Sequence, residues 1–277
     1  MSIQRSIVLV YYREPEFLRS TLSALQAEFL DASAEAEIIV VDNAFDDQMK
    51  KEVEQSWPAV RWVTSPSNLY YGGGNNLGVS KAQGVWVCIL NCDVSWEAGM
   101  LKKFFALAES RADVQLAVPL LRYPDGRTQV SAHKNFPTLG SVFVDYCLPL
   151  QLYAMRYGVH PMQLSTIDHQ TGFITHATGV ALYVQRSVFL SSGGFDPAYE
   201  MYLEETDWQR RLSKSGIHPY FIAETPIVHF GSAQKKWAQA TPQYLLSLRH
   251  YANRWWEKQD GWYLWPTLSL AAILSTL

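Results

Sequence analysis

The sequence predicts an α/β fold, with a Rossmann-like, mostly parallel central sheet flanked by helices and a helical extension at the C-terminus. Two observations lead to this prediction. Strand-like and helix-like segments alternate through the first half of the chain, which is the pattern of βαβ units. The segment 85–90 is apolar on both faces, as expected of a strand buried inside a parallel sheet.

The elements of the first half follow from the spacing of apolar residues. Short apolar runs predict strands at 6–11, 37–41, 60–64 and 85–90. Apolar residues at helical spacing predict a helix over 15–30, and Trp57-Pro58 ends a shorter helix over 46–56. The glycine run 72–74 opens a further helix that reaches Lys81.

The second half is less regular. Strands are predicted at 114–121, 177–184, 220–223 and 227–230, and helices at 205–215 and 243–256. Gly216 closes the first of these helices. Residues 128–170 mix proline, tyrosine, histidine and leucine without a clear period, so we expect functional loops there.

Composition limits the function classes. The chain has 277 residues, of which 48% are hydrophobic and 18% charged, as in an ordinary globular protein. The formal net charge of −3 excludes the basic excess of a nucleic-acid-binding protein. Cys88, Cys92 and Cys147 form no CxxC pair, which favours free thiols in a reducing compartment. The apolar run 7–12 is too short for a signal peptide and is expected to be the first strand.

The C-terminal segment 261–277 has two interpretations. It begins with Trp262, Tyr263 and Trp265, and carries no charge from Thr267 to the end. It is shorter than the about 20 apolar residues of a membrane span. Its aromatic residues suit a membrane interface, and a helix packed on the domain fits the same pattern.

Polar and aromatic residues follow several predicted strands. Tyr11 ends the first strand, Asp42 and Asn43 follow the second, and Asn91 and Asp93 follow the fourth. Ligands of open α/β sheets bind beyond the carboxyl ends of the strands, so these residues are expected to converge on one crevice.

The chemistry of these strand ends suits a nucleotide ligand. Asp42 is a candidate acceptor for ribose or base hydrogen bonds, and Tyr11 is a candidate for stacking on the base. Gly73, Gly74 and Asn75 would let backbone amides approach a ligand closely, although a flexible turn would have the same sequence. Neither GxGxxG after the first strand nor a GxxxxGK[ST] loop is present, so a dinucleotide site and a P-loop are excluded.

A second acidic cluster, with Glu204, Glu205 and Asp207, enters the helix near residue 205. Acidic residues at a helix N-terminus are favoured by the macrodipole, and adjacent carboxylates also serve as general bases. His229 ends a later strand. With Asp93 it would form a hard-cation site completed by phosphate oxygens and water, while a structural role for each residue stays open.

Taken in order, these motifs resemble the family 2 glycosyltransferases with the GT-A fold, especially the rhamnosyltransferase-like branch of bacterial polysaccharide assembly. The resemblance covers roughly residues 7–230. It rests on Val40-Val41-Asp42-Asn43, Leu90-Asn91-Cys92-Asp93, Gly193-Gly194-Phe195-Asp196, Glu204–Asp207 and His229.

The resemblance implies an inverting transfer of a sugar from a nucleotide diphosphate sugar (dTDP, UDP or GDP type) to a glycan or lipid-linked acceptor. The branch implies L-rhamnose as one candidate sugar. Separately, the apolar tail 261–277 suggests a cytoplasmic enzyme with peripheral contact to the inner face of the membrane. The corresponding domains are 1–235 for the GT-A unit and 236–277 for the C-terminal extension.

The resemblance also implies roles for single residues. Asp93 matches the last Asp of a DxD-like motif that binds Mg²⁺ or Mn²⁺ on the diphosphate, and His229 matches a residue that joins this metal site. Asp42 and Tyr11 match the nucleoside pocket. Glu205 stands where the family has its Asp base, so Glu204 and Asp207 remain alternatives for the base.

Two other functions stay open at this point. A catalytically silent sugar-nucleotide or glycan-binding protein is suggested by two departures from the family, Glu205 for Asp and Cys92 for Pro. A sugar-phosphate nucleotidyltransferase would share a parallel-sheet core, but its glycine- and arginine-rich first loop is missing.

Overall fold

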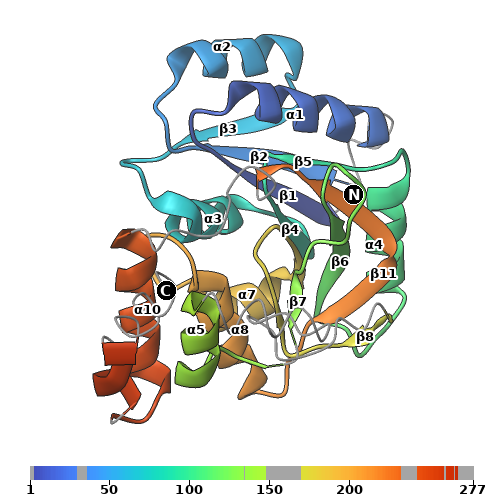
Figure 1. Cartoon of the computed structure of the whole chain (residues 1–277). Coiled ribbons are helices and arrows are strands. Elements are labelled where there is room, and N and C mark those ends of the chain that lie inside the picture. Colours follow the sequence, from blue (N-terminus) through green and yellow to red (C-terminus); the bar gives the residue numbers. More distant parts are fainter. Residues whose placement is uncertain are drawn as a thin grey trace.

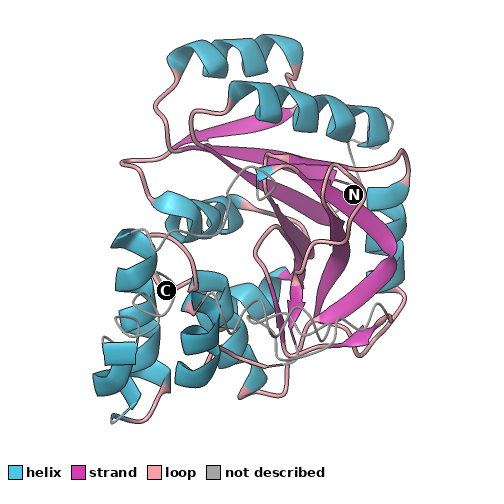
Figure 2. Cartoon of the chain, viewed as in Figure 1, coloured by secondary structure: helices cyan, strands magenta, loops and turns pink. Residues whose placement is uncertain are grey.

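A computed structural model describes residues 3–29, 36–133, 135–147, 170–231, 242–258, 260–264 and 266–267. One large sheet runs through the molecule, with helices on both of its faces (Figures 1 and 2). The strands are β1 (Arg5–Tyr11), β2 (Ala36–Asp42), β3 (Val60–Thr64), β4 (Trp86–Leu90), β5 (Val94–Ser95), β6 (Leu116–Arg122), β7 (Ala132–His133), β8 (Gly172–Phe173), β9 (His176–Ala177), β10 (Ala181–Gln185) and β11 (Tyr220–His229). The helices are α1 (Pro15–Phe29), α2 (Asp47–Ser56), α3 (Tyr70–Lys81), α4 (Met100–Glu109), α5 (Leu139–Tyr146), α7 (Arg186–Ser191), α8 (Glu204–Ser213) and α10 (Pro242–Trp255).

The large sheet has the strand order β3-β2-β1-β4-β10-β6-β11-β5, with β8 paired to β11. The pairs β1–β2, β1–β4, β2–β3 and β6–β11 are parallel, which confirms the predicted mostly parallel sheet. Strand β10 runs antiparallel between β4 and β6, and this reversal was not predicted.

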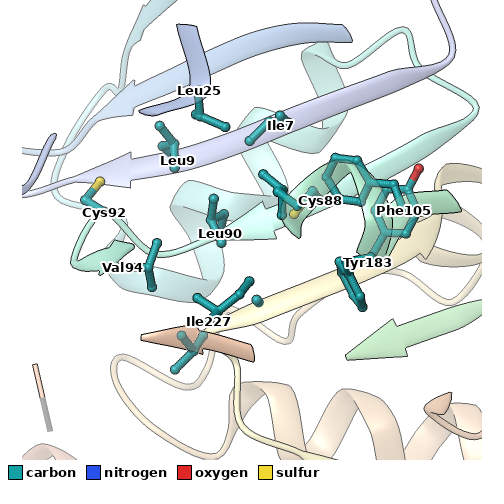
Figure 3. Close-up of a cluster of buried hydrophobic side chains, with 14 of the residues drawn as sticks. Ile7, Leu9, Leu25, Cys88, Leu90, Cys92, Val94, Phe105, Tyr183 and Ile227 are labelled. Carbon is teal, nitrogen blue, oxygen red and sulfur yellow. The ribbon is translucent and has the colours of Figure 1, made fainter. Parts of the chain in front are cut away.

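Side chains that alternate along the buried strands form two separate cores. Ile7 and Leu9 of β1 point to the layer of α1, α2 and α4, whereas Val8 points to the layer of α3, α7 and α8. Figure 3 shows part of the first core, in which Leu90 of β4 lies among side chains from β1 and β11. A strand buried on both faces, such as β4, therefore reads as a continuous apolar run.

A third, smaller core joins α10 to the rest of the molecule. Leu248, Tyr251 and Ala252 of α10 pack with Tyr199 and Leu203, which precede α8. Figure 1 shows α10 beside α5 and α8, at the end of the sheet where α3 lies. The predicted boundary between residues 235 and 236 stays a prediction.

Most predicted elements lie within one or two residues of the observed ones. The strands predicted at 220–223 and 227–230 are one strand, β11, whose register with β6 shifts between Ile222 and Ile227. The strand predicted at 177–184 is divided into β9 and β10. The three cysteines are free and buried, as expected.

Two sequence predictions concern residues that lie partly outside the described ranges. They are the loops of 128–170 and the C-terminal segment 261–277. Among the helices that the structure describes, none has both the length and the apolar character needed to cross a bilayer.

Candidate active site

Asp93 and His229 lie next to each other because two short strands pair. Strand β4 is buried along its whole length, and beyond it the Asn91 N–H donates to the Val180 carbonyl. The chain then forms β5, which pairs antiparallel with β11 so that Val94 faces His229. The Phe230 N–H donates to the Asp93 carbonyl, and His229 Nε2 lies 3.3 Å from Asp93 Oδ2.

A buried glutamine orients the histidine. His229 Nδ1 lies 3.1 Å from Gln129 Oε1. An amide oxygen only accepts hydrogen bonds, so Nδ1–H is the donor to Gln129, and Nε2 faces Asp93. Burial acts to raise the pKa of Asp93, but hydrogen bonds from His229 and Asn91 and the charge of His229 outweigh it and hold this pKa below its usual value.

The surroundings of this pair fit a divalent cation. A Cβ atom at Gly231 would lie 2.1 Å from Asp93 Oδ2 and 3.5 Å from His229 Nε2, so glycine leaves space in front of both groups. A carboxylate oxygen and an imidazole nitrogen are both ligands of Mn²⁺-type cations. Within the described ranges no three His, Cys, Asp or Glu side chains gather around one point, so phosphate oxygens and water would complete the coordination.

The acidic cluster begins α8. Its N-cap, Leu203, has a left-handed backbone with φ of 68°, and Tyr202 before it has φ of 69°. Glu204 is 4% exposed, and its Oε2 has no hydrogen-bond partner within the described structure. Burial and the neighbouring charge of Glu205 raise the pKa of Glu204 well above its usual value.

Glu205 and Asp207 have different surroundings. Glu205 is partly exposed, and burial raises its pKa to about 7 although hydrogen bonds from its own N–H and from Thr206 act to lower it. Asp207 is fully buried and accepts hydrogen bonds from Trp255 Nε1 at 2.7 Å and Arg211 Nε at 2.9 Å. The lone pairs of Asp207 are therefore already used within the fold, whereas Glu205 has access to solvent.

Helix α3 connects the acidic pair to the sheet edge. A Cβ atom at Gly72 would lie 3.5 Å from Glu204 Cγ. The Tyr71 hydroxyl donates to the Gly179 carbonyl, next to the Val180 that binds Asn91. Burial raises the pKa of Tyr71 well above its usual value, and the charges of the two glutamates add to this effect. The fold therefore brings together segments near residues 72, 91, 179 and 204.

The glycine run packs α3 against the sheet. A Cβ at Gly74 would lie 2.9 Å from Val10 Cγ1 and 3.1 Å from Asn43 Nδ2. A Cβ at Gly73 would lie 3.0 Å from Leu69 Cβ. Asn75 is buried, and its Nδ2 donates to the Tyr71 carbonyl. These contacts explain the glycines by close packing, and a donor-binding role for Gly73, Gly74 and Asn75 stays a prediction.

The residues at the ends of β1 and β2 shape their own loops. Asp42 is buried and accepts from the N–H groups of Ala44 at 2.8 Å and Asp46 at 3.0 Å. Asn43 Nδ2 donates to the Tyr70 carbonyl at 2.8 Å. Tyr11 is buried in the first core, and its hydroxyl donates to Asp46 Oδ2 at 2.8 Å. In this conformation Tyr11 offers no ring face to a ligand, and the nucleoside roles of all three residues stay predictions.

Sequence reasoning did not identify Gln129, Tyr71 or Gly231 as parts of the site. Tyr71 directly precedes the glycine run, which was a usable signal for a close helix–sheet contact. Gln129 and Gly231 had no local signal, because their roles depend on the pairing of β5 with β11.

Comparison with known proteins identifies the family of the chain. Residues 6–177, more than half of the chain, match the family model described as glycosyl transferase family 2. The chain is 26% identical to the N-acetylglucosaminyl-diphospho-decaprenol L-rhamnosyltransferase of Mycobacterium tuberculosis, over 97% of this chain and 91% of the relative. It is 22% identical to the rhamnosyltransferase WbbL of Escherichia coli, over 90% of this chain and 95% of the relative.

Solved structures share the fold at low sequence identity. GalNAc-T7 with UDP, GalNAc and Mn²⁺ matches with a TM-score of 0.67 and 15% identity, over 99% of this chain and 52% of that one. A mannosyltransferase from Pyrobaculum calidifontis with GDP-Man and Mn²⁺ matches with a TM-score of 0.64 and 13% identity, over all of this chain and 74% of that one. The fold is thus GT-A, as the resemblance implied, and the chain belongs to glycosyl transferase family 2, as a glycosyltransferase of its rhamnosyltransferase-like branch.

Proposed function

We propose that the protein transfers an L-rhamnosyl group from a nucleotide diphosphate donor to a hydroxyl of a lipid-linked glycan, with inversion at the anomeric carbon. The names of the two relatives support rhamnose as the sugar, and the M. tuberculosis name supports a polyprenyl diphosphate-linked acceptor. Direct attack assisted by one base produces inversion, in contrast to the two-step route of retention.

The observation that carries this proposal is the presence of two different charged sites at one end of the sheet. Asp93 and His229 form one site, and Glu204 and Glu205 form the other. A divalent cation, Mg²⁺ or Mn²⁺, held by Asp93 and His229 would neutralise the charge of the leaving diphosphate.

Glu205 is the proposed base. The residue is partly exposed, and its pKa of about 7 suits proton transfer near neutral pH. Glu204 lies buried beside it, and Asp207 is held by hydrogen bonds within the fold. Their surroundings support a role in placing Glu205 rather than in accepting the proton.

The test is transfer to a synthetic polyprenyl diphospho-N-acetylglucosamine, with Mn²⁺ and a panel of dTDP-, UDP- and GDP-sugars. We expect product with dTDP-L-rhamnose, and loss of product when EDTA removes the metal. Donor binding without transfer to any acceptor would instead identify a silent sugar-nucleotide-binding protein. The absence of both donor binding and sugar transfer would overturn the proposal.

We also propose that the C-terminal segment contacts a membrane surface, the location of a lipid-linked acceptor. Trp262 is 83% exposed and Tyr263 is 60% exposed, whereas Leu264 beside them is buried. Exposed aromatic side chains at one end of the chain are suited to a lipid headgroup layer.

A further inference from the structure

We propose that α10 is part of the catalytic apparatus, because it holds the start of α8 in the position that presents Glu204 and Glu205. This inference rests on the proposed function, since it takes these glutamates as the base site. It assigns Asp207, Trp255 and Ser247 as positioning residues, which act on the reaction through Glu205.

The first contact between α10 and α8 is the carboxylate of Asp207. It is fully buried and lies one helical turn after Glu204. Its Oδ1 accepts from Trp255 Nε1 at 2.7 Å and lies 3.4 Å from Arg254 Nε, and both of these residues belong to α10. Hydrogen bonds to a buried carboxylate are strong, so they fix the distance between the two helices.

The second contact holds a strained backbone. Tyr202 and Leu203 both adopt left-handed conformations, which are unfavourable for residues other than glycine. Such residues persist only where their surroundings hold them. Here Ser247 Oγ of α10 donates to the Met201 carbonyl at 2.8 Å, and Leu203 packs with Leu248.

The third set of contacts lies farther from the glutamate pair, at Asp196 before it and at Arg210 after it. Asp196 Oδ2 accepts from Arg254 Nη1 at 2.7 Å, and His250 Nε2 lies 3.4 Å from the same oxygen. Arg210 of α8 donates to the Tyr251 hydroxyl at 2.8 Å, and its guanidinium lies 4.9 Å from the centroid of the Trp255 ring. The acidic segment is therefore bound to α10 both before and after the glutamate pair.

These contacts make the position of the Glu205 carboxylate depend on α10. A reacting group that moves by about 1 Å can lose on the order of 100-fold in rate. Loss of one α10 contact is therefore expected to lower kcat, while donor binding at the Asp93–His229 pair, which makes none of these contacts with α10, is expected to be unaffected.

The experiment compares two neighbouring tryptophans. Trp255→Phe removes the N–H donor to Asp207 and keeps an aromatic ring. Trp256→Phe removes an N–H that donates to the Pro137 carbonyl at 3.0 Å and not to the acidic segment, so it is the matched control. Transfer is measured with the donor and acceptor on which the wild-type protein is active, and nucleotide binding is measured by titration with dTDP and Mn²⁺.

We expect Trp255→Phe to lower kcat by about tenfold or more with an unchanged dTDP affinity, and Trp256→Phe to stay within about twofold of wild type. Equal kcat for Trp255→Phe and wild type, with both folded by circular dichroism, would overturn the inference. If Trp255→Phe does not fold, Ser247→Ala is tested instead, and a kcat equal to that of wild type would overturn the inference.

Failure of the proposed function can be told apart from failure of this inference, because wild-type protein would then transfer no sugar.

Discussion

At Glu205, the fold changes the chemistry of an ordinary carboxyl group. Its low-polarity surroundings favour the neutral carboxyl group and raise its pKa to about 7. The residue still keeps part of its surface exposed to solvent. Asp207, two residues later in the same helix turn, is instead surrounded by donors from α8 and α10. Two carboxylates so close in sequence thus have different properties because their neighbours differ.

The raised pKa of Glu205 predicts the pH dependence of transfer. Below pH 7 the carboxyl group is protonated and cannot accept a proton, and above pH 7 it is ionised. We therefore expect kcat to rise with pH through about 7. Glu205→Gln should lower kcat by on the order of 10²- to 10⁴-fold and remove this dependence. Glu224→Gln, on an exposed part of β11, is the control and should keep the wild-type profile; an unchanged profile in Glu205→Gln would exclude Glu205 as the base.

Gln129 predicts a measurable effect on metal binding. Its amide oxygen keeps the Nδ1 proton of His229 in place and so directs Nε2 toward Asp93. Gln129→Leu should weaken Mn²⁺ binding by about 10- to 100-fold, as is usual when the partner of a metal-binding histidine is lost. Electron paramagnetic resonance titration of free Mn²⁺ measures this without an activity assay. Wild-type affinity in Gln129→Leu would remove Gln129 from the metal site.

At the scale of elements, α3 shows how a glycine-rich segment becomes a helix that carries a site. Glycine is a poor helix former, so this segment is helical because it packs closely on the sheet. Gly74 and Gly78 lie against β1, and Gly72 lies against Glu204 of α8. The small residues bring α3 near enough to the sheet for Tyr71 to reach the Gly179 carbonyl.

This packing predicts the cost of a single methyl group. A Cβ at Gly78 would lie 2.3 Å from Val8 Cγ1 and 3.1 Å from Val41 Cγ2, both in a closed core. Gly78→Ala should therefore lower the free energy of unfolding by about 1–3 kcal/mol, measured by denaturant titration. Gly140→Ala is the control, because among the described residues its Cβ would meet only Thr138 Oγ1, at 3.9 Å, and helix propensity favours alanine. Equal stability of Gly78→Ala and wild type would contradict the close packing.

At the scale of the whole molecule, the large sheet and the three cores bring the two charged sites to the same end. The β5–β11 pair carries Asp93 to His229, and α10 packs against the lead-in to α8. Figure 1 shows α10 at the end of the molecule where α3 and α8 also lie. A membrane contact made by Trp262 and Tyr263, which follow α10 in the chain, would therefore lie at the same end of the molecule as Glu204 and Glu205.

Vesicle binding tests the proposed membrane contact. We expect the full chain to sediment with anionic vesicles, and the double variant Trp262→Ser, Tyr263→Ser to bind at least about tenfold more weakly, because two exposed apolar side chains are lost. Leu190→Ser on α7 removes a similarly exposed apolar residue elsewhere and should bind as wild type. Equal sedimentation of the double variant and wild type would refute the contact.

The sequence by itself determined the alternation of strands and helices, the buried character of β4 and the order of the motifs. These features are local: apolar spacing and strand-end residues are visible without long-range contacts. They were enough to predict the α/β fold and the family resemblance, both of which are confirmed.

Only the tertiary structure decided which of these residues meet. The antiparallel β10, the Gln129–His229–Asp93 arrangement and the hydrogen bonds of Asp207 all join segments far apart in the chain. Local sequence carries no signal of such pairings, because their free energy comes from packing and hydrogen bonds between distant elements. For the same reason the sequence kept Glu204 and Asp207 as alternatives to Glu205, and the different burial and partners of the three in the fold support the proposal of Glu205.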